Sequence, residues 1–175
     1  LAEQLAEVDG GLPVSVYDFV AMGVWRKVGA CGGLGRAARA RIEAAIAAVG
    51  LEGFERRVVG TLSGGQMQRT LFARLLLQDS PVILLDEPFN AIDAKTCADL
   101  MALILRWHGE RRTIVAVLHD IELVRRHFPE TVLIAREVVA WGETADVLTP
   151  VNLLKARRMI EAFEAEAHVC DRGAA

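Results

Sequence analysis

The sequence predicts an α/β protein with a parallel sheet at its core, and two observations support this prediction. Three apolar runs, PVILLD at 81–86, TIVAVLH at 113–119 and TVLIA at 131–135, are typical of buried strands. Helical patterns at 93–107 and 120–128 separate these runs. Strands that alternate with helices favour a parallel sheet joined by crossover helices. In such sheets ligands gather beyond the carboxyl ends of the strands, so the residues that follow each run are candidate site residues.

Helices are predicted before the first strand. Ser15 followed by Asp18 is a capping pattern for a short helix that begins near Val16. A second helix is indicated by apolar residues at 42, 45, 46 and 49, which recur at helical spacing, and Gly50 supplies its stop. These apolar positions indicate core packing and imply no chemistry.

Two further elements are predicted after the third strand. The run VVAWG at 138–142 could pair with the preceding strand as a hairpin, and Pro150 introduces a C-terminal helix. We therefore expect a helical lobe at 16–80, a strand-rich core at 81–150 and a C-terminal helix with its tail at 151–175.

Composition limits the size and the setting of the protein. With 175 residues, of which 53% are hydrophobic, the chain can bury one sizeable core and is short for two full domains. A net charge of -3 gives no electrostatic argument for nucleic acid or an anionic membrane surface as a partner. Three widely spaced cysteines favour reduced, cytosolic thiols. Charges interrupt every apolar stretch, so work at a membrane would need another chain to span the bilayer.

The stretch TLSGGQMQRT at 61–70 predicts a helix whose first turn could hold an anion. Ser63 and Gln66 form a capping box, which by itself predicts only a helix start. Gly64 and Gly65 are unexplained by capping, since each glycine in a helix costs roughly 0.5 to 1 kcal/mol relative to alanine. Their use would be to let an anion approach the backbone amides at the positive helix end.

Acidic residues and a histidine follow the first two predicted strands. Asp86 and Glu87 end the run VILLDE, where an aspartate can hold Mg2+ and its neighbour can orient or deprotonate a water; a solvated strand end with a proline stop is the structural alternative. His119 ends the second run, where we expect it to lie beside the two carboxylates. Asp93, in NAID, is a helix cap that can also have a function.

Four motifs in this order resemble those of ABC-transporter ATPases. LSGGQ at 62–66 is similar to the signature motif, LLDEP at 84–88 to Walker B, AID at 91–93 to the D-loop and LHD at 118–120 to the H-loop. Gln4 falls where the family has its Q-loop glutamine, although the usual aromatic-leucine-proline lead-in is absent. The resemblance extends from the Q-loop to about Arg158 and implies a partial ABC ATPase domain over 1–175, with a P-loop NTPase-like fold.

The resemblance also implies a mechanism with ATP and Mg2+ as cofactors. In the family, ATP binds between two subunits arranged head to tail, so Ser63, Gly64, Gly65 and Gln66 would complete the partner's site and Asp93 would organise the opposite subunit. Asp86 and Gln4 would hold Mg2+. Glu87 would polarise the attacking water, and His119 would contact the terminal phosphate. NAID in place of the more usual SALD lacks the serine of that motif.

The resemblance implies a transport function at the cytoplasmic face of the cell membrane. SVYDFVAMGVWRK at 15–27 and DEPFNAIDAKT at 86–96 are similar to the ATPase subunits of zinc, manganese and iron importers. Partners would be a second ATPase subunit in a homodimer, a transmembrane permease and, indirectly, a substrate-binding protein, with no nucleic acid. The alternatives are a soluble ABC-type ATPase and a non-hydrolysing interaction module.

The 175 residues contain no glycine-rich phosphate loop ending in Gly-Lys-Ser or Gly-Lys-Thr, because none of the three lysines follows a glycine. The chain also opens within the Q-loop region. We therefore expect a fragment of a longer subunit, active as an ATP hydrolase in its full-length form and inactive as the 175-residue chain alone.

Overall fold

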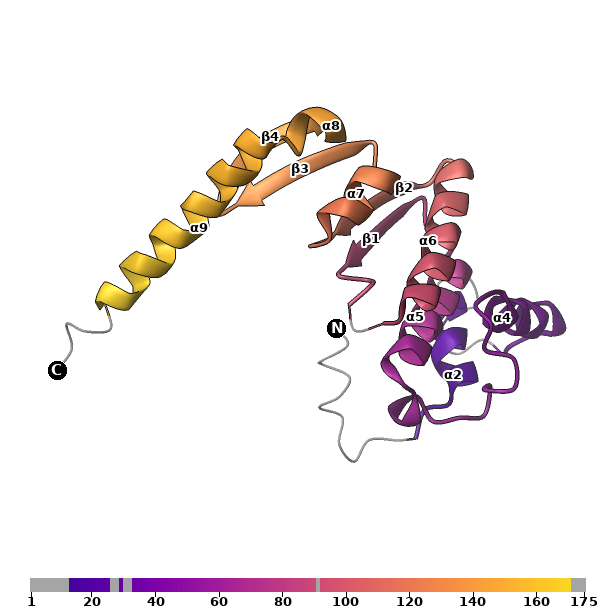
Figure 1. Cartoon of the computed structure of the whole chain (residues 1–175). Coiled ribbons are helices and arrows are strands. Elements are labelled where there is room, and N and C mark those ends of the chain that lie inside the picture. Colours follow the sequence, from indigo (N-terminus) through magenta and orange to yellow (C-terminus); the bar gives the residue numbers. More distant parts are fainter. Residues whose placement is uncertain (1–12, 26–28, 30–32, 91, 171–175) are drawn as a thin grey trace. The chain divides into compact units, whose positions relative to one another are not determined.

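The chain is described in two units. The computed structural model describes residues 13–25, 29, 33–90 and 92–170, with side chains to residue 162. The first unit is Leu1–Val117 and the second is Leu118–Ala175, and the elements of each are labelled in Figure 1. Gln4 lies outside the described residues. The subdivision at 80/81 and 150/151 stays a prediction.

The first unit is a cluster of helices followed by two strands with a helix between them (Figure 1). In chain order its elements are α2 (Val16–Ala21), η1 (Met22–Val24), α4 (Arg36–Ala48), η2 (Val59–Thr61), α5 (Gly64–Gln78), β1 (Val82–Asp86), α6 (Ala94–Gly109) and β2 (Thr113–Val117).

Local sequence sets the limits of these helices. The Ser15 side chain accepts a hydrogen bond of 3.1 Å from the Asp18 amide, which caps α2 as predicted. After α4, Gly50 turns the chain with φ of 68°, and at the end of α5 the C-cap Asp79 has φ of 52°. Glycine adopts such left-handed angles freely, and aspartate tolerates them better than most residues.

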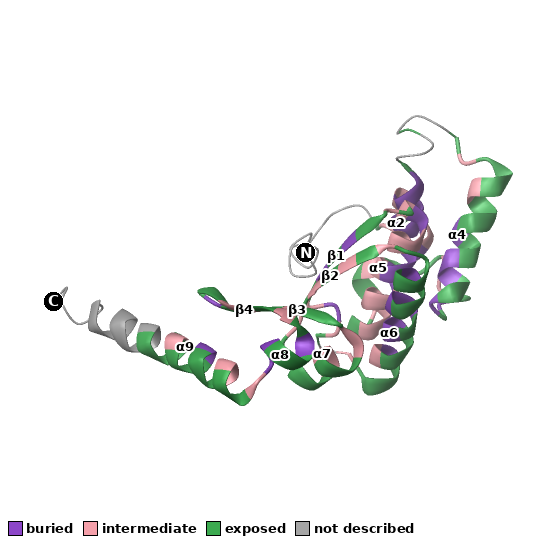
Figure 2. Ribbon diagram, turned by 90° about the horizontal axis from the view of Figure 1, so that it is seen from above, coloured by how far each residue is buried: buried purple, intermediate pink, exposed green. Residues whose placement is uncertain are grey.

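The core of the first unit lies between α2, α4, α5 and α6 (Figure 2). Phe72 of α5 stacks on Trp107 of α6 with ring centroids 5.6 Å apart, and both side chains are fully buried. Gly23 lies against α5, where a Cβ would come within 2.6 Å of the Arg74 carbonyl oxygen. A side chain at this position would therefore force η1 away from α5.

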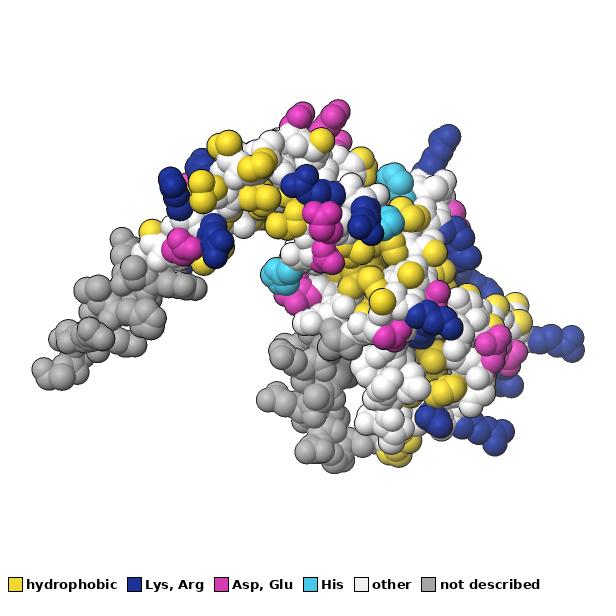
Figure 3. Space-filling model, in the orientation of Figure 1, with side chains coloured by type: hydrophobic (Ala, Val, Ile, Leu, Met, Phe, Trp, Pro, Cys, Tyr) yellow, Lys and Arg dark blue, Asp and Glu magenta, His cyan; other side chains and the backbone are white. Residues whose placement is uncertain are grey.

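β1 and β2 pair in parallel, as the sequence predicts, with Asp86 opposite Val117. Ile83 and Leu85 are buried, whereas Leu84 on the other face is 72% exposed. The expectation that this run is a buried strand is therefore met on one face only, because in the described residues the helices of the first unit cover a single side. Apolar side chains gather on the visible surface in this region (Figure 3).

In its described residues, 118–170, the second unit contains a hairpin and three helices (Figure 1). Its elements are α7 (Ile121–His127), β3 (Glu130–Ala135), β4 (Glu137–Glu143), α8 (Thr144–Val147) and α9 (Pro150–Cys170). Asp120 caps α7 by accepting hydrogen bonds from the Glu122 and Leu123 amides, at 2.9 and 3.0 Å.

Among the described residues β3 forms no ladder with β1 or β2, and its predicted place beside them stays a prediction. β3 pairs antiparallel with β4, with Val132 opposite Trp141, and β1–β2 forms a separate two-stranded sheet. Arg136 alone joins these two strands and has φ of 65°, which reverses the chain. The predicted hairpin with the run at 138–142 is confirmed.

None of the described helices combines the length and the apolar character that crossing a bilayer requires.

Candidate functional site

The start of α5 is built as the capping box predicts. The Ser63 hydroxyl accepts a hydrogen bond of 3.3 Å from the Gln66 amide, and the Gln66 side-chain oxygen accepts one of 3.0 Å from the Ser63 amide. Helix geometry gives the amides of Gly64 and Gly65 no acceptor within the helix. Because Ser63 and Gly64 are exposed, the first turn presents backbone donors and a positive helix end to the surface.

The start of α6 is capped by a carboxylate. Asp93 accepts a hydrogen bond of 2.9 Å from the Thr96 amide and one of 2.7 Å from the Thr96 hydroxyl. The hydroxyl, followed by the amide, holds the pKa of Asp93 below its usual value. Asp93 is exposed and therefore remains an anion at neutral pH.

The two helix starts lie next to each other. A Cβ built on Gly65 would lie 3.6 Å from the Thr96 hydroxyl oxygen and 3.8 Å from an Asp93 carboxylate oxygen. The structure thus brings Asp93 together with Ser63, Gly64, Gly65 and Gln66, which sequence reasoning had assigned to one site from two separate motifs.

Sequence reasoning missed Arg69, which ties the two helix starts together. Its guanidinium donates to the Val49 carbonyl at 2.9 Å, to the Thr96 hydroxyl at 3.2 Å and to the Asp99 carboxylate at 2.8 Å. A signal was present: Arg69 lies at i relative to the buried Phe72 and Ala73 at i+3 and i+4, so it shares the buried face of α5. A cation on such a face needs partners.

The two predicted carboxylates lie at the carboxyl end of β1. Asp86 is the last residue of the strand and lies on its exposed face. Glu87 follows with φ of 45°, a left-handed angle that strains a residue with a Cβ. Its amide donates to the Val117 carbonyl at 3.1 Å, so the pairing with β2 extends one residue past Asp86.

A turn after β1 holds Glu87 in place. The Asn90 amide donates to the Glu87 carbonyl at 3.1 Å, and the Asn90 side-chain amide donates to a Glu87 carboxylate oxygen at 3.2 Å. Pro88 between them is fully buried. The turn therefore fixes both the backbone and the side chain of Glu87.

For two predicted site residues the structure gives no position relative to the others. His119 lies in the second unit, and its expected place beside Asp86 and Glu87 stays a prediction. Gln4 lies outside the described residues. Within the described part of the chain, no three His, Cys, Asp or Glu side chains form a cluster that could hold a metal ion by themselves.

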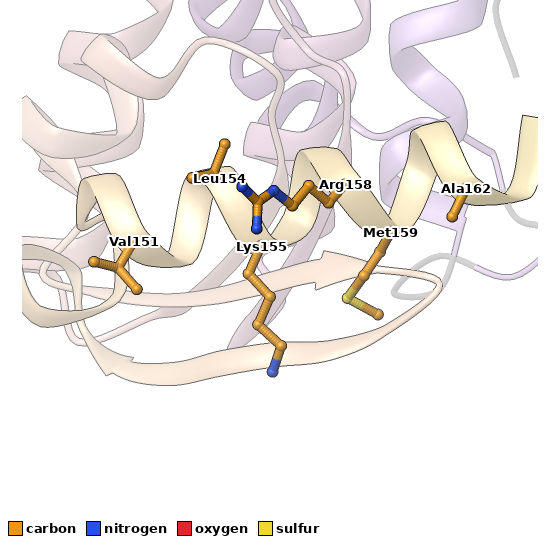
Figure 4. A pocket seen from close by; sticks show the side chains of 6 residues that line it. All are labelled: Val151, Leu154, Lys155, Arg158, Met159 and Ala162. Carbon is orange, nitrogen blue, oxygen red and sulfur yellow. The ribbon is translucent and has the colours of Figure 1, made fainter.

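The Asp86 carboxylate suits Mg2+, because this ion is commonly held by one or two carboxylates together with substrate phosphates and water. A separate pocket of the second unit runs along α9 (Figure 4). It contains none of the predicted site residues. Its lining is apolar with two cationic side chains, namely Val151, Leu154, Lys155, Arg158, Met159 and Ala162.

Comparison with protein families gives a match to the ABC transporter model over residues 4–90. The manganese transport system ATP-binding protein MntB of Halalkalibacterium halodurans is 34% identical over 148 residues, covering 85% of this chain and 59% of the relative. MntA of Synechocystis, with the same description, is 34% identical over 173 residues, covering 94% and 66%. The zinc transport system ATP-binding protein TroB of Treponema pallidum is 35% identical over 153 residues, covering 87% and 58%.

Solved structures of ABC proteins share the fold. A metal-chelate type ABC transporter in an inward-facing conformation superposes with a TM-score of 0.75 at 27% identity, covering 83% of this chain and 58% of that one. A dimeric ATP-binding cassette in a post-hydrolysis state, bound to ADP and Pi, superposes with a TM-score of 0.66 at 29% identity, covering 77% and 59%.

These relatives are longer than the chain, which spans 58–66% of the length of the three curated proteins described above. The family match, the identities near one third and the shared fold agree with the four motifs and with the helix start at Ser63. The chain belongs to the family of ABC transporter ATP-binding subunits.

Proposed function

We propose that this chain is part of an ATP-binding and hydrolysing subunit that powers an ABC importer for a metal cation. The observation that supports it most directly is the pairing of two helix starts, in which Gly65 of α5 lies against the Asp93 cap of α6. One start offers amides to an anion, and the other holds a fixed carboxylate beside them. A helix start with open amides suits a phosphate, and in this proposal the Asp93 carboxylate organises the opposite subunit.

In this proposal the start of α5 binds a phosphate of ATP held by a second, identical subunit. Ser63 is a neutral cap, so the positive end of the helix is available to an anion from outside the subunit. Gly64 and Gly65 let that anion approach the backbone. The exposure of Ser63 and Gly64 fits a site that is completed by another chain.

The two carboxylates at the carboxyl end of β1 have different roles in this proposal. Asp86, with Gln4, would hold Mg2+, which would supply charge neutralisation at the phosphates. Glu87 accepts a hydrogen bond from the attacking water and takes up its proton. The Asn90 side chain orients the Glu87 carboxylate at 3.2 Å, and His119 contacts the terminal phosphate.

The proposed partners are a second ATPase subunit, a transmembrane permease and a substrate-binding protein that meets the metal. The subunit would then work at the cytoplasmic face of the membrane. The dimeric cassette structure supports the first partner, and the named manganese and zinc systems support the others. Because those names belong to the relatives, the metal itself is a proposal.

The proposed activity is tested by Glu87→Gln in the full-length subunit, with Glu122→Gln as the matched control. Glu122 is an exposed carboxylate of α7 with no assigned role, and its side chain is 73% exposed. Glu87→Gln keeps size but removes the proton acceptor, so turnover should fall roughly 100- to 10,000-fold while MgATP still binds. ATP hydrolysis and nucleotide affinity are measured on both variants.

Wild-type turnover in Glu87→Gln would remove Glu87 from its role, and absence of hydrolysis in the unaltered subunit would favour a non-hydrolysing module. The substrate is tested separately, with the permease and the binding protein in vesicles. Hydrolysis that rises with Mn2+ or Zn2+ on the binding protein, and not with Mg2+ alone, is the expected result. Hydrolysis independent of the permease would favour a soluble ATPase.

A further inference from the structure

Two hydrogen bonds connect Arg69 to Asp93 through the Thr96 hydroxyl, and we call these three residues the relay. A threonine hydroxyl has one proton to donate. The Arg69 guanidinium can only donate, so at 3.2 Å the Thr96 oxygen is the acceptor. The proton of that hydroxyl is therefore directed to the Asp93 carboxylate, 2.7 Å away. The cation thus fixes which way the hydroxyl points, and the hydroxyl fixes one carboxylate oxygen.

The relay is held from both of its ends. The Arg69 side chain is 17% exposed, and its bond to the Asp99 carboxylate is 2.8 Å long. Its second nitrogen donates to the carbonyl of Val49, the C-cap of α4. Thr96 is buried, and its amide also donates to Asp93. A guanidinium with three partners on two other helices has little freedom to move, so the relay is rigid.

Gly65 gives this relay a position at the candidate site. The atoms nearest to a Cβ at Gly65 are the Thr96 hydroxyl oxygen, an Asp93 oxygen and the Thr96 methyl, at 3.6, 3.8 and 3.8 Å. A displacement of Thr96 or Asp93 would therefore change what lies beside the second amide of α5. Arg69 belongs to α5 itself, so it couples the two helix starts directly.

We propose that Arg69 and Thr96 are positioning residues, which hold the Asp93 carboxylate and the amides of Ser63–Gln66 at one fixed spacing for the neighbouring subunit's nucleotide. The proposal rests on the proposed function, because the shared ligand is the phosphate of a second subunit. It differs from a purely structural role in one respect: loss of the relay weakens ATP-dependent pairing of subunits without weakening each subunit's own grip on ATP.

Arg112 supplies a matched control for the test. Its side chain is 16% exposed, close to the 17% of Arg69, and it bridges Asp79 and Glu110 at 3.1 Å each. Loss of either guanidinium should destabilise the fold to a similar degree. Arg112 contacts neither helix start in these ion pairs, so its loss should leave the pairing of subunits unchanged.

The first measurement uses the full-length Glu87→Gln subunit with Arg69→Gln, Thr96→Val, Thr96→Ser or Arg112→Gln added. Arg69→Gln and Thr96→Val should raise the dissociation constant of the ATP-bound dimer about tenfold, since a hydrogen bond to a charged group is lost. Thr96→Ser keeps the hydroxyl and should restore the parent value. MgATP affinity of the monomer should stay constant in all variants.

The second measurement uses the full-length subunit without nucleotide and follows the Asp93 carboxyl by NMR. Thr96→Val and Arg69→Gln should raise the pKa of Asp93 towards its ordinary value, and Arg112→Gln should not. Lys95 and Asp99, the other charged groups near this cap, are unchanged in these variants. If the pKa of Asp93 is the same in Arg69→Gln as in the unaltered protein, the relay from Arg69 to Asp93 is contradicted.

Two further outcomes overturn the positioning role: equal weakening of the dimer by Arg112→Gln and Arg69→Gln, or no restoration by Thr96→Ser. If the Glu87→Gln parent forms no dimer with ATP, the proposed function fails instead. The NMR measurement then still decides whether Arg69 and Thr96 hold the Asp93 carboxylate in place.

Discussion

The starts of α5 and α6 are both capped by a side chain, but one cap is neutral and the other is negatively charged. Ser63 caps α5 with a neutral hydroxyl, followed by two glycines, whereas Asp93 caps α6 with a carboxylate that Thr96 holds at 2.9 and 2.7 Å. A carboxylate cap neutralises the positive end of its own helix, and a hydroxyl cap leaves that end available. Identical capping geometry therefore produces an anion receptor in one helix and a fixed anion in the next.

The largest effect is expected from a substitution that blocks the anion site at the start of α5. Ser63→Arg in the full-length Glu87→Gln subunit places a bulky cation at the exposed cap, where the partner's phosphate must approach, and removes the side-chain acceptor of the Gln66 amide. The ATP-dependent dimer should be lost entirely, as gel filtration with MgATP will show. Ser63→Thr keeps the cap and is the control. A dimer that survives Ser63→Arg contradicts the assignment of 63–66 to a neighbour's site.

The next effect measures how much of a site the helix starts provide alone. The 175-residue chain lacks a glycine-rich loop with a lysine, and each charge-assisted contact of such a loop contributes roughly 1.5 to 3 kcal/mol. Its affinity for MgATP should therefore be orders of magnitude below that of the full-length subunit. Calorimetry on both proteins decides this, and micromolar binding by the 175-residue chain would show that these residues form the larger part of the site.

A smaller effect separates the anion receptor from the helix. Gly65→Ala adds a methyl at ordinary contact distance from Thr96 and Asp93, 3.6 and 3.8 Å. The helix should gain about 0.5 to 1 kcal/mol of unfolding free energy, while the ATP-dependent dimer weakens, because the methyl keeps the phosphate from the backbone. Denaturant unfolding and dimer affinity are measured together. A variant that gains both unfolding free energy and dimer affinity would show that Gly65 has no part in binding.

The smallest effect concerns the charge of the other cap. Because the pKa of Asp93 is lowered in the fold, its contribution to stability is present above the ordinary aspartate pKa and is lost as the pH falls through the lowered value. Asp93→Asn keeps the cap but removes this dependence. The difference in unfolding free energy between the unaltered protein and Asp93→Asn should disappear in acid. A difference that is constant with pH would mean that the carboxylate charge is not stabilised at this cap.

Local patterns predicted most of the fold and part of the site. The capping box of Ser63 and Gln66, the cap at Asp93 and the runs that became β1 and β2 are short-range features, and the structure has each of them. The hairpin of β3 and β4 was also predicted from its apolar runs, although its turn at Arg136 has a left-handed angle that arginine does not favour.

Arg69 was missed for a physical reason. Its partners lie 20, 27 and 30 residues away along the chain, at Val49, Thr96 and Asp99. No spacing rule connects residues at such separations. A sequence can therefore show that a cation on the buried face of α5 needs acceptors, but packing decides which acceptors it finds.

Selection for thermal stability alone would act against Glu87. Its φ of 45° places a side chain in the left-handed region, which costs about 1 to 2 kcal/mol for a residue with a Cβ and nothing comparable for glycine. A screen of random variants for heat resistance should therefore enrich Glu87→Gly, although that variant lacks the carboxylate assigned to the attacking water. At this one position durability and turnover are opposed, so a more robust form of the protein must gain its stability elsewhere.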